Sequence, residues 1–544
     1  MIPPTISSQE AAQNFPPLGK NIKALLVWPK LPNSFYSLTG MLELLPEKVV
    51  MPPLGLITVA ALCPPAWTFR LVDEAVEDVT DDDIRWADLV MVGGMQVQRA
   101  GMHEALARAR RLGRRTIVGG PYASNEPGHF LPLADHVVAG EPDEVFMEIA
   151  RDIEEGTARR YYEVAEKPDV TRSPMPRFDL LKFSNYASMS IQFSRGCPFQ
   201  CEFCDIIILY GRKPRTKLPQ QVTAELDALL SLGWMKQVFM VDDNFIGNHA
   251  RALELCVELE KWQQKHDFPV MFYTEASMDL AKKTALLDAM VRANFFYVFL
   301  GIESPSKASL QETKKFQNLA MDPVSCVDLI NERGLWVTGG FIVGFDSDTE
   351  EIFDQQIEFI ERTSIPWAII NGLHAMPGTA LHDRMKKEGR LLDDSLFSSG
   401  DANPSNFRTI LAPEVLLRGQ AKTLAAVYQP DVFYERAWRS MQRWQIKKTQ
   451  HAAKHPGPLG ILGILGRSIW QQGIKSSYRM AYWKYALRIV SHYALNPPKI
   501  WMAATVMISA HHFIPYAQEV VGKLERELQR GETLQELVPV TAEK

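Results

Sequence analysis

The chain has 544 residues, a length that corresponds to roughly three or four domains of about 150 residues each. Hydrophobic residues make up 46% and charged residues 23% of the composition, which excludes a long disordered scaffold and a collagen-like repeat. The net charge of −5 at pH 7 argues against a general nucleic-acid-binding protein. No segment resembles a secretory signal or a membrane-spanning helix. Three of the six cysteines lie within eight positions, so we expect a reducing, cytoplasmic compartment rather than a disulfide framework.

Residues 20–155 alternate short apolar runs with amphipathic stretches, a pattern that predicts a doubly wound, Rossmann-like α/β domain. The predicted strands cover residues 23–28, 68–72, 88–92, 116–118 and 136–139, and the predicted helices include 54–62 and 99–112. Each strand is followed by a glycine, a proline or an aspartate. A single residue of this kind can be explained as the end of a strand. Five together favour a cofactor domain, because doubly wound sheets bind ligands beyond the carboxyl ends of their strands.

A connector that contains prolines and basic residues is expected over 156–187, and a second β/α series over 188–400. Six strands and five helices are predicted in this series: strands 188–194, 237–241, 270–274, 296–300, 336–343 and 367–373, and helices 219–232, 250–265, 282–293, 323–333 and 348–363. Six β/α units over ~190 residues predict a partial (β/α)6 barrel rather than a closed eightfold one. Helical patterns without a strand rhythm predict a helical C-terminal domain over 401–544.

The most informative segment is the cysteine motif Cys197-x3-Cys201-x2-Cys204, on the loop that leaves the first predicted barrel strand. Four-iron clusters normally take four thiolates, so three thiolates leave one iron open to chelate a small molecule. Structural zinc is the alternative, but it needs a fourth Cys or His nearby, and the next histidine is His249. The spacing therefore favours a [4Fe-4S] cluster.

The motif, with Phe203 before the last cysteine, resembles the signature of the radical S-adenosyl-L-methionine (SAM) enzymes. The resemblance implies that SAM binds the open iron. It also implies cofactor contacts from Phe203 and from the ends of later strands. Asp242, Asp243 and Asn244 stand where the family commonly has Gly-Gly-Glu, and Glu303 and Gly344 lie on subsequent strands. No residue is assigned a catalytic role.

A doubly wound domain directly before the barrel resembles the cobalamin-binding class of radical SAM enzymes. The resemblance implies a corrin site lined by Gly93, Met95, Gly119, Gly120 and Glu141. The Asp-x-His-x-x-Gly motif of cobalamin-ligating mutases is absent from the sequence, so no axial histidine is named.

The segments 195–217, 241–248 and 339–346 look like the subgroup that contains the hopanoid C-2 methylase. The resemblance implies a cobalamin-dependent radical SAM methyltransferase of an apolar, isoprenoid-like substrate, with a flavodoxin or ferredoxin as electron donor. One alternative is a cobalamin-binding radical SAM methylase, cyclase or epimerase of pigment or secondary-metabolite biosynthesis. Another, from a different class, is a non-enzymatic iron–sulfur sensor.

The charge is distributed unevenly, because residues 436–518 contain 12 Lys/Arg and no Asp or Glu. The whole-chain charge of −5 therefore leaves −17 on the remainder. Basic residues mixed with Trp, Tyr and short apolar runs suit a surface on anionic lipid, here the inner face of the membrane. A helical subdomain that packs on the acidic remainder is an equal alternative, and nucleic acid is the least favoured.

Overall fold

The computed structural model describes residues 15–319, 321–392, 405–451 and 458–530. The chain forms two compact units that interleave along the sequence. Unit 1 comprises the described parts of Met1–Pro32, Lys48–Gly196 and Asp205–Trp234. Unit 2 comprises the described parts of Asn33–Glu47, Cys197–Cys204 and Met235–Lys544. The expected domain boundary at residues 400–401 lies outside the described residues.

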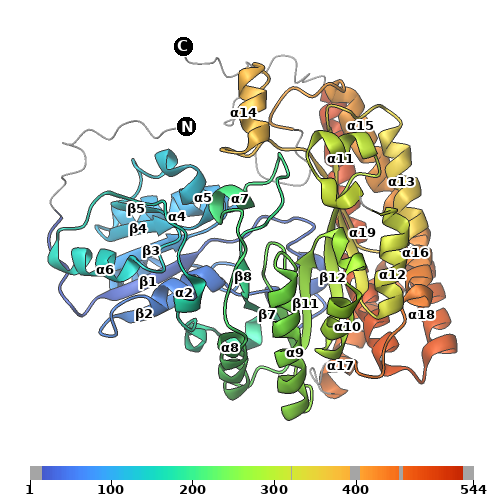
Figure 1. The fold of residues 1–544 in the computed structure, drawn as a ribbon, viewed down its shortest axis with the longest axis horizontal. Helices are drawn as coiled ribbons and strands as arrows, with labels where there is room; N and C mark the ends of the chain where they lie inside the picture. Colours follow the sequence, from blue (N-terminus) through green and yellow to red (C-terminus); the bar gives the residue numbers. More distant parts are fainter. Residues whose placement is uncertain (1–14, 320, 393–404, 452–457, 531–544) are drawn as a thin grey trace. The chain divides into compact units, whose positions relative to one another are not determined.

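Unit 1 contains a parallel six-stranded sheet in the order β2-β1-β3-β4-β5-β6, seen among the blue and cyan strands of Figure 1. This doubly wound order places the topological switch between β1 and β3. Its strands are β1 (Lys23–Trp28), β2 (Thr68–Asp73), β3 (Leu89–Gly93), β4 (Arg115–Gly119), β5 (His136–Gly140) and β6 (Tyr161–Val164). Its main helices are α2 (Leu54–Ala61), α3 (Asp81–Trp86), α4 (Arg99–Arg111), α5 (Pro121–Asn125) and α6 (Phe146–Glu155).

Alternate residues of these strands pack into two separate cores, because side chains of a strand point to opposite faces of its sheet. Leu25, Val27 and Val90 pack with Met102 and Leu106 of α4. Neighbouring residues of the same strands, such as Leu26 and Met91, pack with Ile149 and Ile153 of α6. Both faces are therefore covered, as the near-continuous apolar strands predict.

The segment 156–187, expected as a connector, also contains the sheet's edge strand β6, which pairs in parallel with β5. Unit 1 continues with β7 (Ser188–Ile191), the short antiparallel pair β8 (Ser194–Arg195) and β9 (Arg215–Thr216), and helices α7 (Ile206–Leu209) and α8 (Pro219–Ser231).

Unit 2 contains five parallel strands that lie side by side in chain order. They are β10 (Gln237–Met240), β11 (Met271–Ala276), β12 (Phe295–Glu303), β13 (Trp336–Val343) and β14 (Ala368–Gly372). The accompanying helices are α9 (His249–Lys265), α10 (Thr284–Arg292), α11 (Lys307–Glu312), α12 (Pro323–Arg333), α13 (Ile352–Thr363) and α14 (Ala380–Lys387). All six strands predicted for the second series are present, counting β7.

The C-terminal part of unit 2 is helical, as predicted, and appears in orange and red in Figure 1. It consists of α15 (Pro413–Val427), α16 (Pro430–Arg443), α17 (Pro458–Ser468), a π-helical turn η9 (Ile469–Lys475), α18 (Arg479–Tyr493) and α19 (Pro497–Arg530). In the described parts of the chain, no helix is both long and apolar enough to cross a membrane.

The segment Asn33–Glu47 packs on α19, although nearly the whole chain lies between them. Its short helix α1 (Thr39–Leu42) contacts α19. The Gly40 amide donates to Nδ1 of His512 (3.3 Å), and His512 Nε2 lies 3.0 Å from the Ser34 carbonyl oxygen. Burial lowers the pKa of His512 to about 4, so the imidazole is neutral at physiological pH and can accept at Nδ1.

Gly40→Ala should lower the free energy of unfolding by about 1–3 kcal/mol, as overpacking generally does. A Cβ atom at this position would lie 2.7 Å from the backbone oxygen of His511, which cannot rotate away. Gly466→Ala is the matched control, because a Cβ there meets nothing within 4 Å. Denaturant unfolding measures both variants, and equal stability of Gly40→Ala and wild type would contradict the close packing.

Candidate active site

The three motif cysteines lie in the cysteine loop, Cys197–Cys204, which has no helix or strand of its own. All three are unbridged; Cys201 is buried and the other two are half-buried. Side-chain amides approach two of the sulfurs, with Asn244 Nδ2 3.7 Å from Cys197 Sγ and Gln317 Nε2 3.5 Å from Cys201 Sγ. Amide donors of this kind stabilise thiolates that ligate iron.

Among the described residues, no three His, Cys, Asp or Glu side chains converge on one metal ion. In a [4Fe-4S] cluster each thiolate bonds a different iron, so the sulfurs need not meet at one point. The three unbridged thiols of the cysteine loop can therefore serve as ligands of three different irons.

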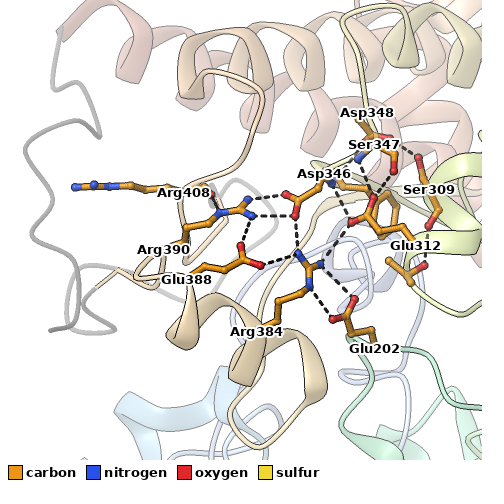
Figure 2. Close-up of polar contacts among 12 residues, drawn as sticks. Glu202, Ser309, Glu312, Asp346, Ser347, Asp348, Arg384, Glu388, Arg390 and Arg408 are labelled. Carbon is orange, nitrogen blue, oxygen red and sulfur yellow. Dashed lines mark hydrogen bonds and ion pairs between the residues drawn. The ribbon is translucent and has the colours of Figure 1, made fainter. Parts of the chain in front are cut away.

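Glu202, between Cys201 and Phe203, fixes the cysteine loop through backbone and side chain. Its amide donates to the Thr313 carbonyl (3.0 Å), and its carbonyl accepts from the Leu381 amide (3.0 Å). Its carboxylate accepts two hydrogen bonds from Arg384 of α14, at 2.8 and 3.2 Å (Figure 2). This bidentate pair fixes direction as well as distance, so α14 orients the loop that carries the cysteines.

Arg384 joins the cysteine loop to the loop that follows β13. Its guanidinium also donates to Asp346 (2.6 Å), which in turn accepts from Arg390 (Figure 2). Glu312 accepts from the backbone amides of Asp346 and Ser347, at 3.1 and 2.8 Å. The resulting network links the cysteine loop with α11, α14 and the end of β13.

Asp348 shapes the turn at the end of β13. Its carboxylate accepts from the amides of Gly344 (2.9 Å) and Phe345 (3.0 Å) and from the Ser309 hydroxyl (2.7 Å). Burial, only partly offset by these donors, raises the pKa of Asp348 to about 6. Gly344 has φ +101°, a left-handed conformation that suits glycine, so the expected SAM-contact residue sits in a turn built by Asp348.

Glu303 forms a buried ion pair with Lys315 at 2.5 Å. Burial alone would lower the pKa of Lys315, but the Glu303 carboxylate and the Cys201 and Cys204 thiols raise it above its ordinary value. The ammonium thus lies within electrostatic reach of the cysteine loop and favours its thiolate forms.

The backbone at Glu303 is strained, with φ +67° after a register shift in β12. Asn318 holds this bulge, because its Nδ2 donates to the carbonyls of Gly301 and Ile302, both at 2.9 Å. A Cβ at Gly301 would lie 2.6 Å from Glu303 Oε1 and 2.9 Å from Lys315 Nζ. A side chain at position 301 would therefore displace the end of the Glu303 or the Lys315 side chain.

Acidic side chains gather at the carboxyl ends of β10, β11 and β12. Burial raises the pKa of Glu275 to about 7, and the negative charges of Asp243, Asp242 and Glu303 add to the shift. The carboxylate cluster, meaning these four residues, therefore concentrates negative charge that favours a cation. Asn244, expected at the same strand end, instead donates to Ser277 Oγ at 3.1 Å and approaches Cys197.

Phe203 packs on the turn after β13, with its ring centroid 6.3 Å from that of Phe345. The Lys315 ammonium lies 5.8 Å from the same ring. Cofactor contacts of Phe203, Asp242, Asp243, Asn244, Glu303 and Gly344 remain predictions, but unit 2 brings all these residues to the strand ends or loops around the cysteine loop.

In unit 1, the residues expected around a corrin lie at or just beyond the carboxyl ends of parallel strands. Gly93 ends β3 and Gly119 ends β4. Gly120 has φ +92°, and a Cβ there would lie 3.2 Å from the backbone N and O of Gly94. Met95 is exposed, and its amide donates to Gln98 Oε1 at 2.9 Å. This edge therefore combines closely packed glycine loops with an exposed apolar side chain.

Glu141 follows β5, but its carboxylate is held by two arginines. Arg195 donates to Glu141 (2.9 Å) and to Asp143 (2.7 Å), and Arg215 donates to the other Glu141 oxygen (2.7 Å). All four side chains are largely buried. Any cofactor contact at this position is therefore expected from the backbone around Glu141 rather than from its carboxylate.

Four charged residues of the site were not predicted from the sequence: Arg195, Glu202, Lys315 and Arg384. Glu202 carried a weak signal, because a carboxylate inside the cysteine motif must find a partner once the loop is buried. Lys315 and Arg384 lie 114 and 183 positions after Cys201 and stand at no recognisable spacing from it.

Comparison with known proteins agrees with this geometry. Residues 191–360 match the model of the Radical SAM superfamily, and residues 379–526 match a domain of unknown function (DUF4070). The sequence is 42% identical to an uncharacterized methyltransferase of Synechocystis sp. over 93% of this chain and 94% of that protein. It is 36% identical to the hopanoid C-2 methylase of Rhodopseudomonas palustris over 91% of this chain and 94% of that protein.

Two solved structures share the fold. The radical SAM methyltransferase TsrM from Kitasatospora setae superposes with a TM-score of 0.58 at 17% identity, covering 86% of this chain and 99% of its own. The cobalamin-dependent radical SAM enzyme OxsB superposes with a TM-score of 0.57 at 14% identity, covering 96% of this chain and 82% of its own. The α/β fold with a helical C-terminal region is thereby confirmed.

The chain belongs to the radical SAM methyltransferases. This assignment rests on the radical SAM domain and on the two relatives that match more than nine-tenths of the chain. It is an enzyme whose radical SAM domain uses SAM and a [4Fe-4S] cluster. The non-enzymatic sensor alternative is therefore wrong.

Arg384→Gln should loosen the cysteine loop without unfolding the protein. Loss of the pair with Glu202 should cost about 1–3 kcal/mol, less than a fully buried pair, because the Arg384 side chain is 28% exposed. After anaerobic reconstitution, the iron-to-protein ratio should fall below half that of wild type. Arg362→Gln, which breaks an exposed pair with Glu358 on α13, is the control, and full iron content in both variants would contradict the role of Arg384.

Proposed function

We propose that the chain is a cobalamin-dependent radical SAM methyltransferase that methylates an unactivated carbon of a hopanoid, at C-2. The observation that carries this proposal is the 36% identity to the hopanoid C-2 methylase over 91% of the chain. That match extends well beyond the radical SAM domain, so the two proteins share more than a cofactor-binding core.

The cysteine loop would hold the [4Fe-4S] cluster through Cys197, Cys201 and Cys204. When bound, the cluster and SAM supply a carbon radical that activates the substrate, and cobalamin supplies the methyl group. The chain itself orients the cysteine loop through Glu202 and neutralises part of its thiolate charge through Lys315.

SAM carries positive charge on its sulfonium and its amine. The carboxylate cluster would supply the opposing negative charge. Asp242, Asp243 and Glu303 would contact the amine or ribose, and the turn at Gly344 would lie along the adenine. Asn244 would act mainly on Cys197, and Phe203 would support the turn after β13. The raised pKa of Glu275 supports a site that binds positive charge.

Cobalamin would lie along the strand ends of unit 1, against Gly93, Met95, Gly119, Gly120 and the backbone at Glu141. The fit is supported by the exposed Met95 side chain and by Gly120, whose missing Cβ lets the loops after β3 and β4 pack closely at the strand ends. The switch between β1 and β3 is where sheets of this order bind ligands.

The remaining partners follow from the chemistry. Reduction of the cluster would need a one-electron donor such as a flavodoxin or ferredoxin. A hopanoid resides in membranes, so the enzyme would work in the cytoplasm, at the inner face of the bilayer.

SAM affinity should rise with pH through about 7. Above this pH Glu275 loses its proton, and the added negative charge attracts the SAM cation more strongly. Glu275→Gln should flatten this dependence and bind SAM with about the affinity that wild type shows at low pH. Calorimetry of SAM binding between pH 5.5 and 8.5 measures the effect, and an unchanged profile in Glu275→Gln would assign the titration to another group.

A strain that lacks the gene should lose a hopanoid that is one methyl heavier than its parent compound. Plasmid-borne wild type should restore this lipid, whereas Cys201→Ala should not, because the cluster loses a ligand. Cys256→Ala, which alters a buried cysteine of α9, should restore it. Mass spectrometry of lipid extracts measures the outcome.

A lipid profile that is the same with and without the gene would overturn the hopanoid substrate. The family assignment would stand, and methylated pigments or secondary metabolites would become the compounds to search. Formation of S-adenosylhomocysteine and 5′-deoxyadenosine by the purified holoenzyme distinguishes a methylase from a cyclase or epimerase.

A further inference from the structure

Exposed apolar side chains concentrate on one stretch of the C-terminal helices. In the described parts of the chain, half of the exposed large hydrophobic residues lie between Ile461 and Leu495. They form what we call the apolar surface: Ile461, Leu462, Leu465, Ile469, Trp470, Ile474, Met480, Trp483, Leu487, Val490 and Leu495. Exposed apolar side chains that cluster on a folded protein mark interaction sites.

Helix α18 shows that this exposure is not a packing defect, because the helix is apolar on two faces. Tyr482, Tyr485 and Ile489 are buried inside unit 2. Met480, Trp483, Leu487 and Val490 recur at intervals of three and four residues and form a separate outward stripe. Met480 is 75% exposed and Leu487 is 66% exposed.

The stripe on α18 is continuous with the apolar residues of η9. Trp483 Nε1 donates to the Gly473 carbonyl (2.9 Å), and a Cβ at Gly473 would lie 3.1 Å from the Trp483 ring. Helix α17 runs directly into η9, so Ile461, Leu465 and Ile469 extend the same surface at intervals of four residues.

The stretch of chain that carries the apolar surface contains basic residues and no acidic ones, although Arg488 of α18 pairs with Glu435 of α16. Arg467, Lys475, Arg479 and Lys484 are exposed there, and the sequence has no Asp or Glu from 436 to 518. The beginning of this acid-free segment behaves differently. Arg436 is fully buried and donates to Glu361 (2.7 Å), and Arg443 pairs with Asp328. Internal packing thus accounts for the basic residues of α16 and for part of Arg467, whose Nε donates to the Leu44 carbonyl (2.7 Å). In the described parts of the chain, Lys475, Arg479 and Lys484 form no ion pair with an acidic side chain.

We propose that the apolar surface docks on an anionic lipid bilayer. Exposed Leu, Ile and Met side chains would enter the acyl boundary, Trp470 and Trp483 suit the headgroup level, and the four basic residues would meet lipid phosphates. A second copy of the chain is disfavoured, because a symmetric contact would place these basic residues against their own equivalents. Single-stranded nucleic acid is disfavoured because only two of the eleven side chains of the surface, Trp470 and Trp483, could stack on bases, and the rest are aliphatic.

Flotation of the holoenzyme with vesicles tests this proposal without any methylation assay. Wild type should float with vesicles of phosphatidylglycerol and phosphatidylcholine, and added salt should weaken binding. The double variant Met480→Asp/Leu487→Asp should reduce the bound fraction by about tenfold or more. Ile410→Asp is the matched control, because Ile410 is 65% exposed but lies outside the apolar surface.

A second double variant, Lys475→Gln/Lys484→Gln, isolates the charge. It should weaken binding to anionic vesicles by about tenfold or more and leave binding to pure phosphatidylcholine unchanged. Equal flotation of the Asp double variant and wild type would overturn the proposal. The proposal would also be overturned if the wild-type protein did not bind vesicles but self-associated, and the Asp double variant did not self-associate. That result would identify the surface as a contact between copies.

Discussion

The hydrogen bonds of Glu202 are the constraint on which the reaction centre depends. The cysteine loop contains no regular structure, so its shape comes from contacts with the rest of unit 2. Glu202 supplies three of them, to Thr313, Leu381 and Arg384. Because residues 379–526 match a domain of unknown function, Leu381 and Arg384 belong to that domain and act directly on the cysteine loop. The segment that matches this domain of unknown function is therefore part of the reaction centre's architecture.

Around this loop, unit 2 combines opposite charges at short range. Lys315 is buried beside the thiols, and its partner Glu303 also faces the acidic Asp242, Asp243 and Glu275. One ion pair therefore separates a region that favours thiolates from a region that favours a cation. The strained backbone at Glu303 is the cost of placing this carboxylate between the two regions, and Asn318 offsets it.

Local features of the molecule could be predicted from the sequence, and long-range polar contacts could not. Apolar runs in the sequence predicted most strands of both units. The three cluster cysteines were predicted because they lie within eight positions of one another. Strand β6 was missed because its Tyr-Tyr-Glu-Val sequence stands in a polar segment and owes its structure to pairing with β5. Long-range contacts between loops determine which residues pair with Glu202, Glu303 and Glu141. The local periodicity of the sequence contains no information about such contacts. For Glu141 the sequence indicated a loop near a ligand, whereas the structure shows a carboxylate committed to two arginines.

The packing of the segment Asn33–Glu47 sets the order in which unit 2 can be completed. Phe35 is fully buried against Tyr428, Phe513 and Tyr516, and His512 holds Ser34 from 478 positions later. At about 5–20 residues per second, synthesis of the intervening chain takes roughly half a minute to a minute and a half. Throughout that interval Phe513 and Tyr516 are missing, so the Phe35 ring lacks part of its native packing. Synthesis of α19 completes this packing, so a helix buries a segment of unit 2 that was synthesised well over 400 positions earlier.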